Sequence, residues 1–352
     1  MSYKNGIAAI NLEMPDTVPR SEFSAESHWA LVNKVTGSKI TEHSSPDQRR
    51  EASHAFITAW DYSFCWSVLT HSHIFKNKRS SMGHAVYVAG GTDYDDNIYS
   101  LFNNPDDVYT YDMYEAYGTK DKQTLTAEYN AHYDAECARG LDTVSMTGIY
   151  VTCISGLIDL LGWDILLAAA GNDPEAFGAF VNRYTGWIQQ YFDSLAACKS
   201  PVVMIHDDLV WSNGPFLHPD FYRKFVFPNY KKLLAPLHEA GKKILFTCDG
   251  NYTMFVDDIA EVGVNGFVME PLTDMAYVAE KYGRTHSFVG NADTHVLLNG
   301  SKADIEAEVK RCMDIGKPYP GFFMAVGNHI PANTPVDSAL FYDDAYRRMA
   351  KR

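Results

Sequence analysis

The sequence predicts an α/β fold, a (β/α)8 barrel of the TIM type with an N-terminal extension. After residue 200, short apolar runs alternate with helical stretches in about five strand–helix units, which is the pattern of a parallel sheet covered by helices. The chain before residue 200 has room for about three more units, and eight close a barrel. No glycine-rich phosphate-binding fingerprint follows any strand, which disfavours the alternative, a doubly wound open sheet.

The 352 residues are expected to form two parts. Residues 1–80 are expected to be an extension with lead-in helices, because the first 50 or so are polar and weakly patterned. Residues 81–352 are expected to form the catalytic barrel. Within the extension, the aromatic stretch Arg50–Thr70 is expected to be helical, with Trp60 and Tyr62 lining a substrate pocket as an apolar lid. Core packing is the alternative for both rings.

The expected strands are short apolar runs bounded by glycine, proline or polar residues. In chain order they are 83–91, 143–149, 201–206, 242–248, 266–270, 286–291 and 321–329.

The expected helices between them have recognisable start signals. Asp173 and Pro174 give one helix an N-cap and a proline in its first turn, and Ser301 with Asp304 forms a capping box. Pro228 is expected to kink the helix that contains it. The expected helices are 120–139, 157–164, 172–197, 218–241, one ending near 263, 273–283, 301–316 and one beginning at 334.

Composition restricts the function. A net charge of −14 disfavours nucleic-acid binding, because a phosphate backbone requires clustered Lys and Arg, and it disfavours a polyanionic substrate. The six cysteines include no CxxC pair, which indicates reduced thiols in the cytoplasm. With no apolar run long enough for a membrane span and no signal-like start, we expect a cytoplasmic protein without a membrane partner. The sequence leaves the oligomeric state open, with a homodimer as one option.

Three strand ends carry metal-ligand side chains. Cys248, Glu270 and His329 each follow a short apolar run, and strand ends of an α/β barrel gather on one face. Alone, the thiol reads as a small buried side chain, the carboxylate as a strand terminus and the imidazole as a backbone partner. Together they provide three ligand types that zinc accepts while keeping a fourth position open. The sequence therefore predicts a catalytic zinc site.

Further polar residues follow the same strands. His206, Asp207 and Asp208 are expected to orient the substrate or to protonate its leaving oxygen; a solvated loop or a second layer around the metal is the alternative. Asn291 and Asp293 are expected to contact substrate or to fix their turn. Nearby, Asp249 and Asn251 are expected to hold the turn that presents Cys248.

Residues 140–350 resemble the uroporphyrinogen decarboxylase superfamily, and within it the zinc-dependent, corrinoid-linked methyltransferase branch. The resemblance rests on Gly241–Asn251 with its Cys-Asp-Gly-Asn turn, on Gly290–Asp293, on Gly327–Pro335, and on the shorter matches Leu161–Asp164 and Asp173–Glu175. The first 80 residues match weakly.

Cobalamin-independent methionine synthases share this barrel and bind zinc through a His-x-Cys pair, a glutamate and a second cysteine. Compared with that pattern, Phe246 stands at the histidine position and His329 replaces the last cysteine. A set with one thiolate leaves zinc more Lewis-acidic, which suits an ether oxygen better than a thiolate. The resemblance then implies an O-demethylase: zinc binds the oxygen of an aryl methyl ether, a cobalt(I) corrinoid on a partner protein takes the methyl group, and the phenolate leaves.

Three alternatives remain open. A uroporphyrinogen decarboxylase should receive its many carboxylates on an arginine-rich segment, and only Arg49 and Arg50 occur together here. A methylcobalamin:thiol methyltransferase should have a second cysteine ligand, and Cys312 lies in an expected helix. A non-enzymatic corrinoid or tetrapyrrole carrier would bind no metal and turn nothing over.

Overall fold

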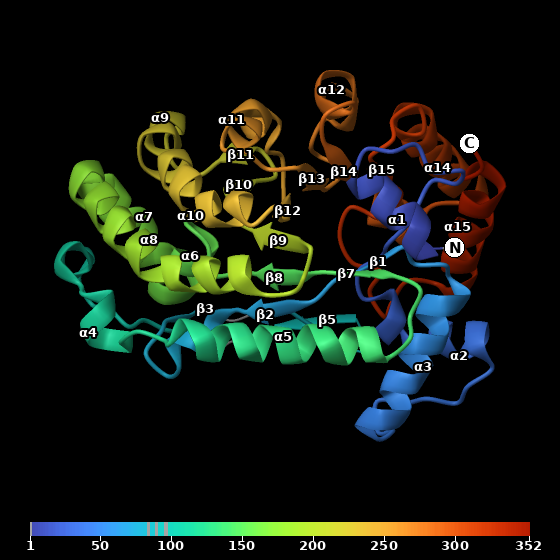
Figure 1. The fold of residues 1–352 in the computed structure, drawn as a ribbon, viewed down its shortest axis with the longest axis horizontal. Coiled ribbons are helices and arrows are strands. Elements are labelled where there is room, and N and C mark those ends of the chain that lie inside the picture. The colour runs from blue at the N-terminus through green and yellow to red at the C-terminus, as the bar shows by residue number, and fades with distance from the viewer. Residues whose placement is uncertain (1, 83–84, 89–90, 95–97) are drawn as a thin grey trace.

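The computed structural model describes residues 2–82, 85–88, 91–94 and 98–352. Its centre is a seven-stranded sheet in which every neighbouring pair is parallel, with helices around it (Figure 1). The strand order is β15 (Phe322–Phe323), β14 (Ser287–Val289), β13 (Gly266–Met269), β12 (Lys243–Cys248), β9 (Val202–His206), β8 (Thr147–Ile149) and β2 (Val68–Thr70). This arrangement confirms the α/β prediction.

The two edges of the sheet are connected by a segment of the N-terminal extension. Arg20 forms parallel bridges with both Tyr62 and Met324. The backbone N–H of Ser63 donates to the Arg20 carbonyl at 2.8 Å, and the N–H of Met324 donates to the Pro19 carbonyl at 2.9 Å. This segment takes the remaining position in a (β/α)8 barrel, so the sheet draws on residues on both sides of residue 80.

The strands bury side chains on both faces, which gives the barrel two cores. On β12, Leu245 belongs to an inner cluster with Val202 and Phe323, whereas Ile244 and Phe246 pack outward under the helices. Helix α1 (Ser2–Ile10) supplies Ala9 and Ile10 to the inner cluster. Parallel strands covered on both faces read as continuous apolar runs rather than as an alternating pattern.

The helix starts agree with the sequence. Asp173 caps α8 with Pro174 in its first turn, and Ser301 and Asp304 form the expected capping box of α14. Before Pro228, a π-helical turn over Tyr222–Val226 interrupts the helix, which confirms an irregularity there. The α-helices after α1 are α2 (Trp29–Thr36), α3 (Pro46–Ala59), α4 (Met113–Tyr117), α5 (Lys122–Ala138), α6 (Ser155–Leu161), α7 (Trp163–Asn172), α8 (Pro174–Ala197), α9 (Pro219–Phe221), α10 (Phe227–Glu239), α11 (Val256–Glu261), α12 (Met275–Tyr282), α13 (Thr294–Asn299), α14 (Lys302–Gly316) and α15 (Val336–Met349).

Four expected elements differ. The strand expected over 321–329 is confined to β15 (Phe322–Phe323), and the helix expected over 157–164 ends at Leu161, with α7 beginning at Trp163. The stretch Arg50–Thr70 is not one helix: α3 ends at Ala59, Asp61 takes a left-handed φ of 53°, and the chain continues as β1 (Phe64–Cys65) and β2. Pairing of β1 with β7 (Val144–Ser145) in the barrel overrides the local pattern. The expected strand 83–91 lies partly outside the described residues; β4 (Ala85–Val88) pairs with β5 (Gly91–Tyr94) in an antiparallel hairpin beside the main sheet.

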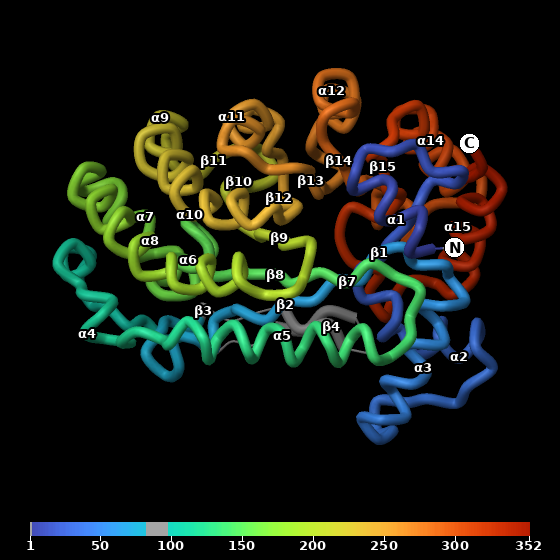
Figure 2. Tube along the Cα trace, in the orientation of Figure 1, coloured from blue at the N-terminus to red at the C-terminus, as the bar shows by residue number. Residues whose placement is uncertain are grey.

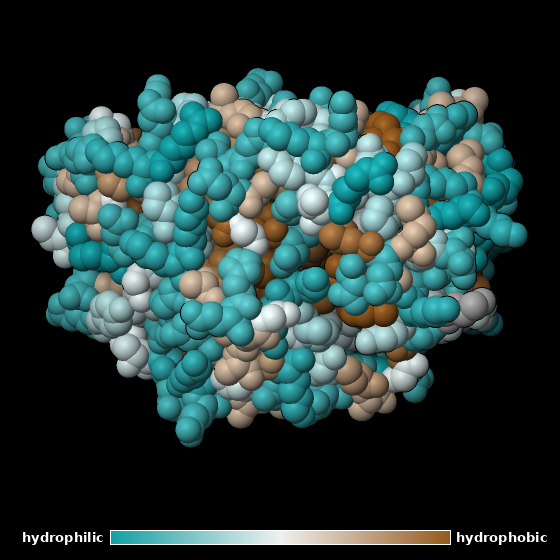
Figure 3. All heavy atoms as spheres, turned by 45° about the horizontal axis from the view of Figure 1, so that its top comes forward, coloured by the Kyte–Doolittle hydropathy of each residue, from teal (hydrophilic) through white to brown (hydrophobic). Residues whose placement is uncertain are grey.

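Both ends of the traced chain lie together (Figure 2). The N–H of Val18 donates to the Ala350 carbonyl at 2.9 Å, and the N–H of Arg352 donates to the Asp16 carbonyl at 3.1 Å. Figure 3 shows a mostly hydrophilic surface with hydrophobic residues gathered near the centre of one face. Within the described ranges, no helix combines the length and apolar character that crossing a bilayer requires.

A buried cation ties these ends to the sheet. Arg20 is fully buried, with its guanidinium 4.5 Å from the ring centres of both Trp60 and Tyr346. It pairs with Glu22 at 3.0 Å and with Asp343 of α15. Burial opposes a charged guanidinium, but these two carboxylates outweigh it and raise the pKa of Arg20. The extension is therefore part of the folded core.

Glu26 is expected to make stability depend on pH. Its Oε2 is shielded from solvent with no hydrogen-bond partner among the described residues, and burial raises the pKa of Glu26 from 4.5 to about 7. Between these values the folded chain keeps a proton that the unfolded chain has lost. Stability should therefore fall as pH rises through this window, by up to about 3 kcal/mol.

Urea unfolding at about pH 4.5 and about pH 7.5 measures this difference. Glu26→Gln should make the dependence shallower, whereas Glu42→Gln at an exposed site should leave it unchanged. An identical pH dependence in the wild type and in Glu26→Gln would contradict the prediction.

Candidate active site

Two adjoining cavities lie at the carboxyl ends of the strands. The inner one has a volume of about 140 Å³, and the outer one has about 360 Å³. Asn328 and His329 border both. The inner cavity is also lined by Phe23, Tyr150, His206, Thr247, Cys248, Asp249, Val268 and Gly327. The outer cavity is also lined by Glu270, Pro271, Leu272, Asp293, Thr294, His295, Leu298, Pro331 and Asn333.

An imidazole and two carboxylates meet at the inner cavity. His206 Nε2 lies 3.6 Å from Asp208 Oδ1 and 3.8 Å from Asp249 Oδ1. One ligand atom from each of the three residues falls within 4.8 Å of the other two, and among the described residues this is the group of such side chains that could hold a metal ion. Asp208 Oδ1 and His206 Nδ1 are buried without a hydrogen-bond partner there.

Neighbouring elements fix these three side chains. His206 is the last residue of β9, and the ring of Tyr150 stacks on it with centroids 4.3 Å apart. Ser155, at the start of α6, donates its hydroxyl to Asp208 Oδ2 at 3.3 Å and accepts the Asp208 N–H at 2.7 Å. Asp249 follows β12 and precedes Gly250, whose φ of 78° and close approach to the Trp211 carbonyl leave no room for a side chain.

The charges in this group are strongly coupled. Burial opposes an imidazolium, yet Asp208 and Asp249 raise the pKa of His206 to about 9. Burial also raises the pKa of Asp208, with repulsion from Asp249 in the same direction. For Asp249, the bond to His206 outweighs burial and lowers its pKa. The group therefore holds excess negative charge, which a cation would stabilise.

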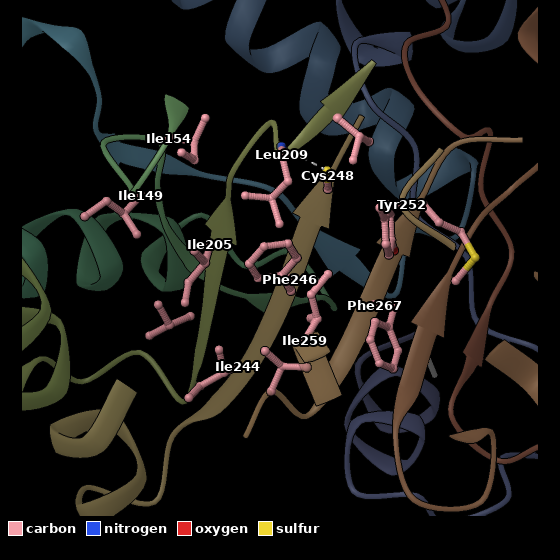
Figure 4. Close-up of a cluster of buried hydrophobic side chains, with 14 of the residues drawn as sticks. Ile149, Ile154, Ile205, Leu209, Ile244, Phe246, Cys248, Tyr252, Ile259 and Phe267 are labelled. Carbon is pink, nitrogen blue, oxygen red and sulfur yellow. Dashed lines mark hydrogen bonds between the residues drawn. The ribbon is translucent and has the colours of Figure 1, made fainter. Parts of the chain in front are cut away.

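The strand register separates Cys248 from this group. Side chains alternate along a strand. On β12, Leu245 points inward, as do Thr247 and then Asp249 beyond the strand, whereas Phe246 and Cys248 belong to the outer core. Figure 4 shows Cys248 beside Leu209, whose N–H donates to its sulfur at 3.4 Å, in the same cluster as Phe246. Burial raises the pKa of the Cys248 thiol well above its usual value.

The three expected zinc ligands do not form one ligand group among the described residues. Cys248 borders the inner cavity, but its thiol is held by Leu209 and donates to the Asp249 carbonyl at 3.3 Å. Glu270 and His329 do reach the cavities. Asp249, expected only to hold the turn, takes the inward position instead, because it continues the inward face of β12.

Glu270 and His329 are held at the junction of the cavities. Glu270 Oε2 accepts the Gly250 N–H at 2.6 Å, and Oε1 accepts the amide of Asn328. Burial and then repulsion from Asp249 raise the pKa of Glu270. His329 Nδ1 contacts the hydroxyl of Ser24, and burial lowers the pKa of His329, which favours a neutral ring.

Asp207 has a structural position. It is fully buried, and its carboxylate accepts the N–H groups of Ile154 and Ser155 at 3.0 and 2.6 Å, along with the hydroxyl of Tyr230. It therefore fixes the start of α6, and through Ser155 it positions Asp208. The structure brings His206 to the inner cavity and Asp208 next to His206, but it turns Asp207 away.

The expected substrate contacts divide in the same way. Asp293 lines the outer cavity and caps α13. Asn291 is fully buried, and its side chain donates to the Glu270 and Thr273 carbonyls at 3.1 Å, so it fixes the turn. Trp60 and Tyr62 are buried in the outer core and line neither cavity, which is the core-packing alternative.

The sequence did not single out Phe23, Ser24 or Tyr150. Phe23 and Ser24 lie in the extension, where no pattern linked them to His329, although Phe23 bridges its backbone. Tyr150 directly follows β8, and its position at a strand end is the signal that could have identified it as a site residue.

The family model for uroporphyrinogen decarboxylase (URO-D) matches residues 137–349. Uroporphyrinogen decarboxylases of Pelobacter propionicus and Syntrophotalea carbinolica are 25% and 26% identical over 178 residues. These alignments cover 51% of this chain and 51% and 50% of the relatives, so the chain spans about half the length of the curated relatives it matches.

A solved methyltransferase from Methanosarcina mazei has the same fold, with a TM-score of 0.66 over 99% of this chain and 98% of that one, at 16% identity. The region matched by the family model, residues 137–349, contains β9, β12, β13 and β15. It therefore contains His206, Asp208, Asp249, Glu270 and His329. Because the family model covers more than half of the residues, the chain belongs to the uroporphyrinogen decarboxylase family.

Proposed function

We propose that this chain is a methyltransferase that moves a methyl group from a small aryl methyl ether to the cobalt(I) corrinoid of a partner protein, with a divalent metal at His206, Asp208 and Asp249. The observation that carries the proposal is that these three groups converge beside the inner cavity, which His206 and Asp249 line, with a buried oxygen of Asp208 lacking a hydrogen-bond partner among the described residues. The fold likeness to the Methanosarcina mazei methyltransferase supports it.

The donor set fits zinc, which accepts imidazole nitrogen and carboxylate oxygen. It contains no sulfur, and hard oxygen ligands leave a strongly Lewis-acidic ion. Such an ion, when bound, polarises an ether oxygen and stabilises the negative charge of the leaving phenolate. Two carboxylates and a neutral imidazole also balance a divalent charge.

The protein's own residues position the substrate. The outer cavity has apolar walls at Leu272, Leu298 and Pro331 that suit an aryl body. From there, the methyl ether would reach past Asn328 and His329 into the inner cavity. Tyr150 and Phe23 bound that cavity and exclude water from the group.

The lining argues against decarboxylation of a porphyrinogen. Neither Lys nor Arg occurs among the residues that line the two cavities. A substrate with many carboxylates would meet Asp249, Glu270 and Asp293 without a compensating cation. Thiol methylation is also less well supported, because Cys248 lies in the outer core and the metal group has no sulfur ligand.

Purified, metal-loaded protein is expected to methylate cob(I)alamin when supplied with a methoxyphenol. The absorbance change from cob(I)alamin to methylcobalamin follows the reaction, and the demethylated phenol should form in equal amount. Heat-treated protein and a substrate-free sample are the controls. If no ether in a panel of methoxyphenols changes the spectrum, O-demethylation is wrong.

A further inference from the structure

The outer cavity is acidic without a basic counterpart. Glu270 stands at its inner end and Asp293 at its wall, and its lining contains no Lys or Arg. Of its two histidines, His295 lies 3.0 Å from Asp293 and is largely exposed, and burial lowers the pKa of His329, which favours a neutral ring.

Glu270 has the hydrogen bonds of an ionised carboxylate. Both of its oxygens accept, Oε2 from the Gly250 N–H and Oε1 from the Asn328 amide, and these two bonds favour the charged form against burial and the repulsion from Asp249, which raise its pKa. Glu270 is half-buried, so its charge is screened less than a charge on the protein surface would be.

The charges near Glu270 are not balanced by a metal alone. Asp208 and Asp249 belong to the candidate metal group, whereas Glu270 lies outside it and lines the outer cavity, so a divalent ion at His206, Asp208 and Asp249 would offset the two carboxylates of that group and not Glu270. One negative charge therefore remains where the inner and outer cavities meet. A cationic group of the substrate would neutralise it.

We propose that the substrate is a methyl ether that carries a positively charged amine, with its ammonium group in the outer cavity near Glu270 and Asp293 and its aryl body on Leu272, Leu298 and Pro331. This inference rests on the proposed function and adds the substrate class. It excludes methoxybenzoate-type anions, whose carboxylate would face Glu270, and it places neutral ethers second.

Three probes of one shape test the inference by calorimetric titration of the metal-loaded protein near pH 7. They are 4-methoxyphenethylamine as the cation, 2-(4-methoxyphenyl)ethanol as the neutral analogue and 4-methoxyphenylacetate as the anion. A charge-assisted contact predicts that the amine binds at least about tenfold more tightly than the alcohol, with the acetate weakest.

Matched variants locate the effect. Glu270→Gln is expected to reduce the preference for the amine over the alcohol to about threefold or less, and Asp293→Asn to reduce it partly. Asp274→Asn is the control, because Asp274 is also a helix N-cap acid but lines neither cavity. It should keep the full preference. Binding in Asp293→Asn keeps the test decisive if Glu270→Gln does not fold.

The outcomes separate the two proposals. If the alcohol or the acetate binds as tightly as the amine, or the amine does not bind at millimolar concentration, the charge inference is overturned. It is also overturned if Asp274→Asn loses the preference as strongly as the pocket variants. Selective amine binding supports the inference even if no methyl group reaches cobalamin, and that missing transfer contradicts the proposed function instead.

Discussion

Asp249→Ala is expected to lose the bound metal and, with it, methyl transfer by about a thousandfold or more, because in the proposed site the carboxylate is one of three ligands. His206→Ala should behave in the same way. Elemental analysis of the purified protein should fall from about one metal per chain to a small fraction of that. Circular dichroism should show that the variants remain folded.

Cys248→Ala is the matched comparison. Its thiol points into the outer core and contacts the Leu209 N–H, so this variant is expected to keep its metal and to lose only about 1 kcal/mol of stability. The sequence pattern predicts the opposite, with Cys248 as a ligand. Loss of metal in Cys248→Ala but not in Asp249→Ala would show that the ligand set of Cys248, Glu270 and His329 is the correct one.

Arg20→Ala should cost about 3–5 kcal/mol of unfolding free energy, the largest stability effect that we expect. The substitution leaves Glu22 fully buried without its cation and opens a space between Trp60 and Tyr346. Chemical denaturation measures the loss.

Arg348→Ala is the control for Arg20. It breaks exposed pairs with Glu306 and Asp344, which should cost about 0.5 kcal/mol. A combined Arg20→Met and Glu22→Leu variant should recover part of the loss, because no isolated charge then stays buried. A loss for Arg20→Ala no larger than for Arg348→Ala would show that the buried pair does not hold the extension.

The Arg20 result also concerns the domain organisation. The residues before 80 looked like a polar lead-in, but residues 19–23 and β2 belong to the sheet, and α1 fills the inner core. The segment around Arg20 has too few apolar residues to read as a strand. Its position depends on pairing with Tyr62 and Met324, which are distant in the sequence.

The sequence by itself determined the strand–helix alternation, the caps at Asp173 and Ser301, and the family resemblance over the C-terminal part. Each of these features depends on residues that are close together in the sequence, so the sequence alone reveals it. It also placed His206 and Glu270 at strand ends, whereas His329 lies beyond the end of β15.

Only the tertiary structure decided which of these residues meet. Because β12 is buried on both faces, its sequence is apolar throughout and contains no alternation that marks its inner side. A shift of one residue exchanges the two faces of a strand, and here it places Asp249 rather than Cys248 in the group of converging side chains. The proposed metal-ligand set therefore depends on a register that barrel closure, rather than local composition, fixes.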